Sequence, residues 1–552
     1  METEDRKHYL RRWAALENER SSWFSHWQEI SDYIAPRRGR FLTSDANRGR
    51  KRNTKIIDST GILALRTLAS GMMSGLTSPA RPWFRIATPD PGLMEFGPVK
   101  DWLSIVEKQL YAIFAASNFY NAIYTVYTEL GAFGTAPLYR EDDFENVVRF
   151  RPFTAGEYAI AEGEDGKVDT LYREFEMTSG QMVKRFDIEA VSTGVKQAFN
   201  LGNYDQRFNV IHAIEPRRSR NSQKRDGKNM PVASCYLEEA GDKFLNQAGY
   251  KKFPAYVPRW DVLGGEDYGR SPAMDALGDV KQLQQEQRRK SEALDKVVSP
   301  PMKGPSSLKN QPADVRPAGM TYVSPQDAVA YGPAYEIRPD LGAITADIRE
   351  VQARINSIFF ADLFMMLANL DGVQPRNVME LAERKEEKLL QLGPVLQRLN
   401  TDLFDPLIDD VFDRAAETGI LPPAPRELIG PDGQGSELKI EYISILAQAQ
   451  QAVGAVAIER TLSFAGNLIG VYPEVRHKID ALQAVDEYAA ITGAPSRIIR
   501  SDDDTGKLIE EERAAMEAQQ MAAGVNGAAQ TAKLMSETDV ASPNALTALV
   551  GA

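Results

Sequence analysis

Apolar side chains recur every three or four residues over residues 10–34, which predicts an amphipathic helix that Pro36 ends. The apolar face of this helix is rich in aromatic side chains, namely Trp13, Trp23, Phe24 and Trp27. Tryptophans at helical spacing are more often core residues than a binding surface. We therefore expect this face to pack inside the protein.

A second apolar stretch with helical period lies between Ser59 and Pro79. Ser59 or Thr60 can cap its first turn, and the helix should end before Pro79. Gly71 and Gly75 are four residues apart and leave one helix face nearly bare, so another backbone can approach closely there.

Two more amphipathic helices are expected over about 99–117 and 119–131, after which the period of the pattern changes. From 137 to about 262, short runs such as "VVRFRPF" and "FNVIHAIEP" alternate apolar and polar residues between Gly, Asn and Pro. This pattern predicts a small mixed β region, with helices near 178–186 and 188–200. Together these segments indicate an α+β protein that is mainly helical.

Residues 272–298 form a predicted helix with strong local signals, since Ser271 can cap it and Pro272 fits its first turn. The helix nevertheless has little apolar surface. Its possible seam includes two polar members in the series Val280, Leu283, Gln287, Lys290, Leu294 and Val297. A second long helix over about 342–363 has a better seam, made of Ile344, Ile348, Val351, Ile355 and Ile358.

The segment 299–341 between these two helices is rich in proline and poor in regular patterns. Two helices that lead to and from such an excursion should lie side by side, with the excursion at their far end. The pair is too polar to be buried in a globule, because its lysines and arginines would lose their hydration. It would be stable in a ring of identical pairs that line a water-filled lumen, or as an exposed coiled-coil arm between two domains.

The C-terminal part is predicted to be mostly helical. A helix over about 377–418 should be kinked at Pro394, and the short strand "ELKIEYI" is followed by helices near 444–470 and 474–492. From about 507 the chain has little to bury, so we expect a tail that is disordered or marginally helical.

The net charge of −12 is unevenly distributed, because residues 37–55 carry eight Lys or Arg residues and only one acid, Asp45. Such a cluster can contact phosphates, although a solvated loop is the commoner explanation.

The single cysteine, Cys235, cannot form an intrachain disulfide, and no run is long and apolar enough to span a membrane. We expect a reducing, soluble compartment and no membrane partner.

Sequence motifs for catalysis are missing. No segment matches the phosphate-binding pattern G-x-x-x-x-G-K-[ST], and neither G-x-S-x-G nor H-E-x-x-H occurs. The four histidines are too far apart to suggest a metal site. We therefore expect a protein that is not an enzyme and that has no cofactor and no metal.

Five segments together resemble the portal proteins of tailed, podovirus-like bacteriophages, which connect head and tail. They are "WQEISDYIAPRRGRF" (27–41), "TLASGMMSGLTSPARPWFRI" (67–86), "VIHAIEPR" (210–217), "EDYGRSPAMDAL" (266–277) and "ERKEEKLLQLGPVLQRLNTDLFDPLI" (383–408). The resemblance implies a ring, usually of twelve subunits, at one capsid vertex of the virion, through which double-stranded DNA is packaged and ejected. It also implies synthesis in the cytoplasm of the bacterial host.

The resemblance also implies a division of the chain into named parts. They are a wing (1–271), a first stem helix (272–298), a clip (299–341), a second stem helix (342–363), a tunnel loop (364–376), a further wing segment with the long kinked helix (377–439), a crown (440–506) and a flexible tail (507–552).

Candidate site residues follow from these parts. The stem residues expected to face a DNA channel are Lys281, Arg288, Arg289, Lys290 and Lys296. The tunnel loop would present Asn369, Asp371, Gln374 and Arg376, and the clip would dock partners through Lys303, Lys309, Arg316 and Tyr322. The basic loop offers a possible contact to DNA or capsid through Arg37, Arg38, Arg48, Arg50, Lys51 and Arg52.

The partners that the resemblance implies are other copies of the chain in a dodecamer, the terminase large subunit, tail adaptor or head-completion proteins, and the major capsid and scaffolding proteins. The missing phosphate-binding motif fits this assignment, since the packaging motor would be a separate chain. Two alternatives from other classes are a non-viral coiled-coil scaffold protein and a DNA-processing enzyme.

Overall fold

The computed structural model describes residues 6–41, 53–224, 226–306, 320–330, 332–334, 340–368, 391–429, 438–443, 458–470, 472–492 and 505–519, together with positions 309, 314, 500 and 521. The chain divides into two compact units. The first contains Met1–Arg85, Glu107–Leu421 and Tyr442–Gln450, and the second contains Ile86–Val106, Pro422–Glu441 and Gln451–Ala552. Helices and strands are both present, as the sequence predicts for an α+β protein.

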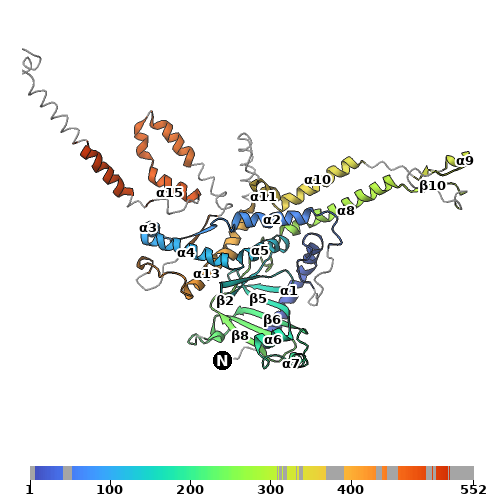
Figure 1. The fold of residues 1–552 in the computed structure, drawn as a ribbon, viewed down its shortest axis with the longest axis horizontal. Helices are drawn as coiled ribbons and strands as arrows, with labels where there is room; N and C mark the ends of the chain where they lie inside the picture. The colour runs from blue at the N-terminus through green and yellow to red at the C-terminus, as the bar shows by residue number, and fades with distance from the viewer. Residues whose placement is uncertain are drawn as a thin grey trace, which may run out of the picture. The chain divides into compact units, whose positions relative to one another are not determined.

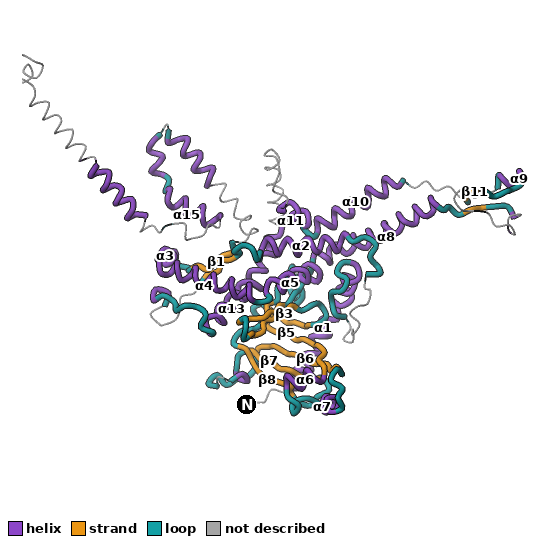
Figure 2. The backbone as a smooth tube through the Cα atoms, in the orientation of Figure 1, coloured by secondary structure: helices purple, strands orange, loops and turns teal. Residues whose placement is uncertain are grey.

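A five-stranded antiparallel sheet in the order β4-β5-β6-β7-β8 forms one part of the first unit (Figures 1 and 2). Its strands are β4 (Tyr158–Glu162), β5 (Val168–Thr178), β6 (Arg207–Pro216), β7 (Val232–Glu238) and β8 (Phe244–Tyr250). A second sheet has the order β3-β2-β9, with β2 (Leu138–Asp143), β3 (Val147–Pro152) and β9 (Ala255–Tyr256). The β region predicted for 137–262 is thereby confirmed.

Helices cover both faces of the five-stranded sheet. On one face, Tyr9, Trp13 and Leu16 of α1 (Arg6–Tyr33) pack on a cluster that includes Ile211 and Leu237. On the other face, α6 (Ser179–Phe186) and α7 (Thr193–Asn200) pack on a cluster that includes Val210 and Tyr236, which directly precede Ile211 and Leu237 in the sequence. Successive strand residues therefore enter opposite cores, because side chains alternate along a strand. The second of these helices begins later than the predicted residue 188.

Two of the three tryptophans of α1 are core residues, as predicted, and Trp23 is half-buried. Trp13 and Trp27 are both buried, and the Trp27 ring lies 5.2 Å from the ring of Tyr268, centroid to centroid. Between them, the buried Arg20 donates hydrogen bonds to the carbonyl oxygens of Gly156 (3.1 Å) and Tyr158 (2.8 Å). These bonds reduce the cost of burying this charged group next to the sheet.

Helix α2 (Thr60–Leu76) packs against α5 (Phe119–Phe133) and α11 (Ala361–Ala368). A Cβ atom at Gly71 would lie 2.0 Å from Cγ of Phe364, so only glycine admits this ring against α2. Close approach at Gly71 is therefore confirmed, but what approaches is an aromatic side chain rather than a backbone. Ser59 precedes α2 without a capping hydrogen bond from its side chain, which corrects the predicted cap.

The N-terminus of α2 is instead capped by Asp58, which also joins α2 to helices α8 (Pro272–Val298) and α10 (Leu341–Ile358). Oδ1 of Asp58 accepts hydrogen bonds from the backbone N–H (2.8 Å) and hydroxyl (2.5 Å) of Thr60. Oδ2 accepts from the side-chain amides of Gln287 (2.9 Å) and Gln352 (3.0 Å). Gln284 completes the group: its Oε1 accepts from the backbone N–H groups of Ile57 and Asp58, and its Nε2 donates to the Asp58 carbonyl.

We call these four residues, Asp58, Gln284, Gln287 and Gln352, the Asp58 cluster. Burial alone would raise the pKa of the Asp58 carboxyl, but hydrogen bonds from Thr60, Gln287 and Gln352 favour the charged form, so the pKa is lowered. The ionised carboxylate is thus the form that holds three helices together.

Two helical breaks differ from prediction. The expected helix over 342–363 ends at Ile358, where Phe360 adopts a left-handed φ of 55°, and α11 follows. The helix predicted over 377–418 is described from residue 391, and it is helical over 391–399; the kink at Pro394 stays a prediction. A π-helical turn that was not predicted follows at Asn400–Phe404, just before Pro406. Pro406 has no N–H to offer the preceding turn, which accounts for a break there. Helix α13 (Asp405–Glu417) then continues the chain.

The second unit contains α3 (Pro91–Glu95), a helix at 458–469, α15 (Ala481–Thr492) and a helix at 505–519. Within it, the indole N–H of Trp102 donates to the carbonyl oxygen of Pro422 (3.0 Å), and the hydroxyl of Tyr488 donates to Glu459 (2.7 Å). Three elements cross a boundary between the units along the chain: β1 (Phe84–Ala87), α4 (Gly97–Ala116) and β12 (Lys439–Tyr442).

Replacing Gly71 tests the packing of α2 on α11. We expect Gly71→Ala to lower the free energy of unfolding by about 1–3 kcal/mol. The new methyl group would overlap Cγ of Phe364, the atom by which the ring is attached to the side chain, so the whole ring must be displaced. Chemical denaturation followed by circular dichroism measures this. The matched control is Gly278→Ala on α8, where a Cβ meets nothing within 4 Å; it should raise stability by about 0.5–1 kcal/mol. Equal effects of the two substitutions would contradict the argument.

Asp58→Asn tests the charge on the Asp58 cluster. Because the folded pKa lies below the unfolded value of about 3.9, the carboxylate's contribution is fully present above that value and is lost as the pH falls through the folded pKa. We expect Asp58→Asn to cost about 1 kcal/mol at pH 7, a low figure for bonds to a charged group because Asp58 is only half-buried.

Urea titrations of both proteins at neutral pH and at about pH 3.5 measure this difference. The difference in the free energy of unfolding between wild type and Asp58→Asn should be smaller at the lower pH. Asp58→Ala, which removes every acceptor, should remain destabilised at both. A gap that stays constant with pH would show that the carboxylate charge is irrelevant.

Candidate functional site: the α8–α10 hairpin

Helices α8 and α10 lie side by side as a long hairpin, with a small structured excursion at its far end (Figures 1 and 2). The excursion contains β10 (Met302–Lys303), β11 (Gly332–Pro333) and the short helix α9 (Pro325–Ala328). The two strands pair antiparallel, with Met302 opposite Pro333. This is the arrangement that the sequence predicts for two helices around a proline-rich insert.

The local signals at the start of α8 act as predicted. The Ser271 hydroxyl accepts a hydrogen bond from the backbone N–H of Met274 (3.2 Å) and donates to the Ala132 carbonyl oxygen (2.8 Å). Pro272 occupies the first turn, where its missing N–H leaves no bond unmade. At the start of α10, Asp340 caps the helix through the N–H of Ala343 (3.0 Å).

Burial along the hairpin is confined to its base. Val280 and Leu283 of α8 and Ile348, Val351 and Ile355 of α10 are buried there. Gln284 is the last residue of α8 that is buried within the described part of the chain. Roughly the outer half of α8 is therefore helical without contributing to a core.

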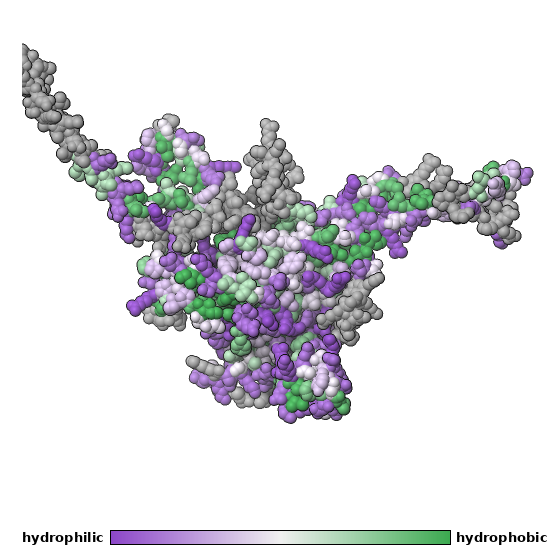
Figure 3. All heavy atoms as spheres, in the orientation of Figure 1, coloured by the Kyte–Doolittle hydropathy of each residue, from purple (hydrophilic) through white to green (hydrophobic). Residues whose placement is uncertain are grey.

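Large apolar side chains lie exposed on this outer half. Leu294, Val297 and Val298 are 39%, 47% and 79% exposed, and Tyr322 in the excursion is 83% exposed. Figure 3 shows apolar and polar residues intermixed along the hairpin. Leaving such side chains in water forgoes roughly 1.5–3 kcal/mol for each one that could be fully buried.

The five predicted channel residues of α8 fall into two groups. Lys281 is held at the base, where its Nζ lies 2.8 Å from Oε2 of Glu29 and 5.6 Å from the ring centroid of Tyr33, both on α1. Arg288, Arg289 and Lys296 are exposed on the outer half, and Lys290 is partly covered. Only one ion pair is resolved among the latter four within the described residues, from Arg288 to Glu292 at 3.4 Å.

Acidic residues interrupt this basic series on the same helix, at Glu286, Glu292 and Asp295. Sequence reasoning did not find the pair that crosses the hairpin, in which Arg354 of α10 lies 3.1 Å from Asp279 of α8. Nor did it find the Asp58 cluster. The ion pair between Arg354 and Asp279 could have been found from the sequence, because two residues of opposite charge face each other across a predicted helix pair.

The predicted docking residues of the excursion are only partly described. Lys303 is on β10 and exposed, Tyr322 is exposed, and Lys309 is an isolated described position that is also exposed. Arg316 lies outside the described residues. The same holds for all four predicted tunnel-loop residues, Asn369, Asp371, Gln374 and Arg376, which follow the end of α11.

The basic loop is described at its start, where its first two arginines differ. Nη1 of Arg38 lies 2.8 Å from Oε1 of Glu129, a buried carboxylate that also accepts a hydrogen bond from the hydroxyl of Thr154. Burial raises the pKa of Glu129, and the Arg38 charge opposes that rise. Arg38 therefore has an internal structural partner, whereas Arg37 is exposed. Arg48, Arg50, Lys51 and Arg52 lie outside the described residues.

Two absences among the described residues bear on the class of site. No group of three or more His, Cys, Asp or Glu residues there is arranged to hold a metal ion. No described helix is long and apolar enough to cross a membrane. The hairpin is distinguished by the exposed apolar and charged side chains on its outer half.

Comparison with known proteins agrees with the resemblance found in the sequence. Residues 6–499 match the family "Bacteriophage head to tail connecting protein". The chain is 46% identical over 553 residues to the "Probable portal protein" of Bordetella phage BPP-1, which covers 99% of this chain and 98% of the relative. It is also 46% identical over 555 residues to the "Portal protein" of Salmonella phage epsilon15, with the same coverage.

A solved structure titled "Neck of empty GTA particle computed with C6 symmetry" aligns with 74% of this chain and 86% of its own, at 10% identity. Its TM-score of 0.35 is too low to support a conclusion about the fold. The family match and the two phage relatives, by contrast, each span most of the chain. The chain therefore belongs to the bacteriophage head to tail connecting protein family.

Proposed function

We propose that copies of this chain assemble into a ring, a dodecamer, at one vertex of the phage capsid, and that double-stranded DNA passes through its channel during packaging and ejection. The α8–α10 hairpin is the stem of each subunit and the excursion is the clip. The tunnel loop, predicted as 364–376, is assigned to 369–376, because residues 364–368 belong to helix α11. Residues 1–271 and 377–439 form the wing, 440–506 the crown and 507–552 the tail. The second stem helix is the segment Leu341–Ile358, shorter than the predicted 342–363.

The observation that carries this proposal is the outer half of α8. It is helical and exposes Leu294, Val297 and Val298, and none of its described residues beyond Gln284 is fully buried. A lone helix of this kind is only marginally stable in water, because most helical stability in proteins comes from packing an apolar face. Neighbouring copies in a closed ring would supply that packing on one side and leave the other side on water.

The mixed charge of α8 suits a wall past which DNA moves. Duplex DNA carries one negative charge per roughly 1.7 Å of axis, so a wall with basic residues alone would bind it tightly. Arg288, Arg289, Lys290 and Lys296 alternate with Glu286, Glu292 and Asp295, and a ring repeats each charge once per subunit. Lys281 is assigned a structural role, since it is paired with Glu29 at the base.

The exposed tip of the hairpin is the proposed docking surface for the terminase large subunit and later for tail adaptor or head-completion proteins. Tyr322 and Lys303 lie there in the open. The wing would meet the major capsid and scaffolding proteins. The protein itself has no catalytic role in this scheme, is made in the host cytoplasm, and ends in the virion.

Assembly is tested by measuring the mass of the purified protein and by electron microscopy. The ring should have a mass on the order of several hundred kilodaltons, far above the 61.3 kDa chain. Leu294→Glu combined with Val297→Glu should abolish the ring, because both side chains would be packed between subunits, and should leave the circular dichroism of the chain unchanged. Leu201→Glu, at an exposed apolar position on the wing, is the control and should still form rings.

A monomer or a small dimer from the wild-type chain would overturn the ring. A dimer with an extended arm would favour the alternative of a coiled-coil scaffold. Nuclease or ATPase activity in the pure protein would favour the alternative of a DNA-processing enzyme.

The charge balance of the channel is tested by Glu292→Lys combined with Asp295→Lys, which leaves an almost wholly basic outer helix. Rings should still form, but particles should package less DNA, because phosphates are held by the wall. The quantity measured is packaged DNA per particle. Glu164→Lys, on an exposed turn of the wing, is the control. Normal packaging by the double variant would contradict a channel position for this helix.

A further inference from the structure

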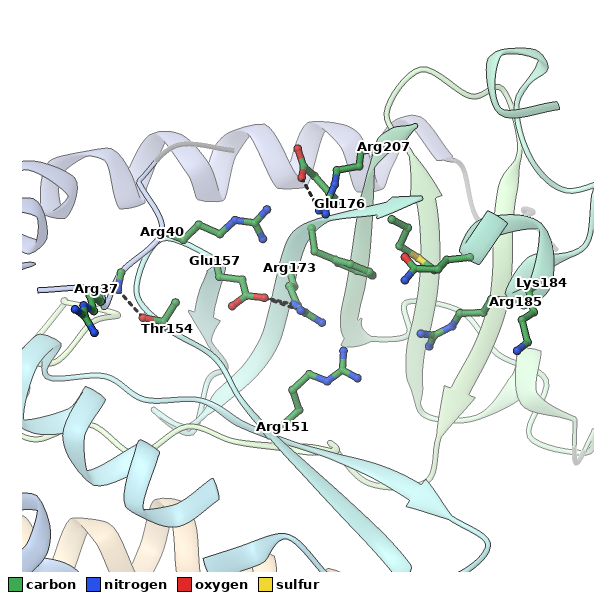
Figure 4. Close-up of a pocket in the computed structure, with 14 residues that line it drawn as sticks. Arg37, Arg40, Arg151, Thr154, Glu157, Arg173, Glu176, Lys184, Arg185 and Arg207 are labelled. Atoms are coloured by element: carbon green, nitrogen blue, oxygen red, sulfur yellow. Dashed lines mark hydrogen bonds and ion pairs between the residues drawn. The ribbon is translucent and has the colours of Figure 1, made fainter. Parts of the chain in front are cut away.

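A pocket of about 900 Å³ opens in the first unit beside the five-stranded sheet (Figure 4). Its walls come from separate parts of the chain: the segment Arg37–Arg40, the strands β3, β5 and β6, the connection between β3 and β4, and the helix α6. The hairpin contributes none of the residues that line these walls.

The lining of this pocket is strongly basic. Besides Arg173, it includes Arg37, Arg40, Arg151, Lys184, Arg185 and Arg207. Two acids share the lining, and each is already paired: Glu157 with Arg173 (2.6 Å) and Glu176 with Arg207 (3.3 Å). The pocket therefore carries a clear excess of positive charge.

Internal contacts fix part of this charge in place. The Arg173 guanidinium lies between the rings of Phe153 and Phe175, 4.5 Å and 4.4 Å from their centroids. Arg185 donates a hydrogen bond to the hydroxyl of Tyr236 (2.9 Å). Guanidinium groups oriented in this way keep further N–H donors available for an oxyanion.

Other charges remain open to a ligand. Arg37 and Lys184 are exposed, and neither side chain has an ion pair or hydrogen bond resolved to the described residues. Tyr236, which accepts the hydrogen bond from Arg185, stacks on the buried His212 with ring centroids 3.9 Å apart. Burial lowers the pKa of His212, and the positive charges of Arg173, Arg185 and Arg151 lower it further, which is consistent with a positive field at the pocket.

We propose that this pocket binds an acidic polypeptide segment of a partner protein, whose closely spaced Asp or Glu carboxylates are held by the arginine groups. Arginine is the preferred partner of carboxylates because its planar group can donate two parallel hydrogen bonds. The lining has six arginines and one lysine, which favours recognition of planar oxyanions over a general attraction of anions.

Shape and aromatic content favour a peptide over a nucleic acid. Duplex DNA presents its phosphates on a stiff convex surface, whereas these basic groups converge on a concavity. Proteins that bind single strands usually offer aromatic rings for bases to stack on. Phe175 is the only aromatic residue in the described lining, and the Arg173 guanidinium already covers its ring.

The test uses the full-length protein and a fluorescein-labelled peptide of six glutamates flanked by Gly and Ser, with binding followed by anisotropy at low salt. We expect saturable binding that weakens as salt is added, because partly exposed charges are screened. Arg37→Glu combined with Lys184→Glu should weaken binding at least about tenfold, since two attractive charges become repulsive.

Arg149→Glu is the matched control. Arg149 is an exposed arginine on the same strand as Arg151 but is outside the pocket lining, and its substitution should change the affinity less than about twofold. Lys184→Glu alone, on an exposed helix position, keeps the test valid if the double variant fails to fold.

The proposal would be overturned by no binding of the peptide by folded protein at low salt, by equal weakening by Arg149→Glu, or by tighter binding of a single-stranded oligothymidylate than of the peptide. Displacement of the peptide by millimolar inorganic phosphate would also overturn it, since it would show a site for simple anions. Competition by an unlabelled glutamate peptide, with no effect of an equal-length lysine peptide, would support it.

Discussion

The hairpin of α8 and α10 depends on a small contact at its base. Five apolar side chains meet there, and beside them the Asp58 carboxylate holds the amides of Gln287 and Gln352 while it caps α2. One ionised group therefore fixes the directions of three helices. Beyond this point on α8, no side chain is fully buried among the residues that the structure describes.

The hairpin combines a buried base with an exposed outer half, and a uniform helix pair could not do the same. A hairpin that were apolar along its full length would aggregate or fold back on its own body, and one that were polar throughout would not remain helical. This one is anchored by bonds at one end and carries scattered apolar residues at the other, which need only moderate cover. That division is what subunits of a ring require, because each must fold before it meets its neighbours.

Local features of the fold were predictable because they rest on short-range rules. Ser271 and Pro272 mark the start of α8 as they would in any helix, and the alternation around Val210 and Ile211 marks a strand covered on both faces. The aromatic face of α1 was correctly assigned to the core for the same reason: its spacing is helical and its neighbours are apolar.

Long-range polar contacts could not be predicted from the sequence. The hydrogen bonds that Gln287 and Gln352 donate to Asp58 join residues more than two hundred positions apart. A glutamine in a helical sequence does not indicate which residue its amide will contact. The same applies to Arg38, which looks like one more member of a basic loop until Glu129 is placed beside it. The basic pocket was equally hidden, since its arginines come from separate strands, a helix and a loop.

Anchorage at one end gives the hairpin the mechanics of a lever. At 1.5 Å per residue, the 14 residues of α8 beyond Gln284 span about 21 Å, so a tilt of about 5° around the base displaces the end of the helix by about 1.8 Å. Arranged around a common axis, such levers would convert a slight rotation near Asp58 into a much larger change of aperture.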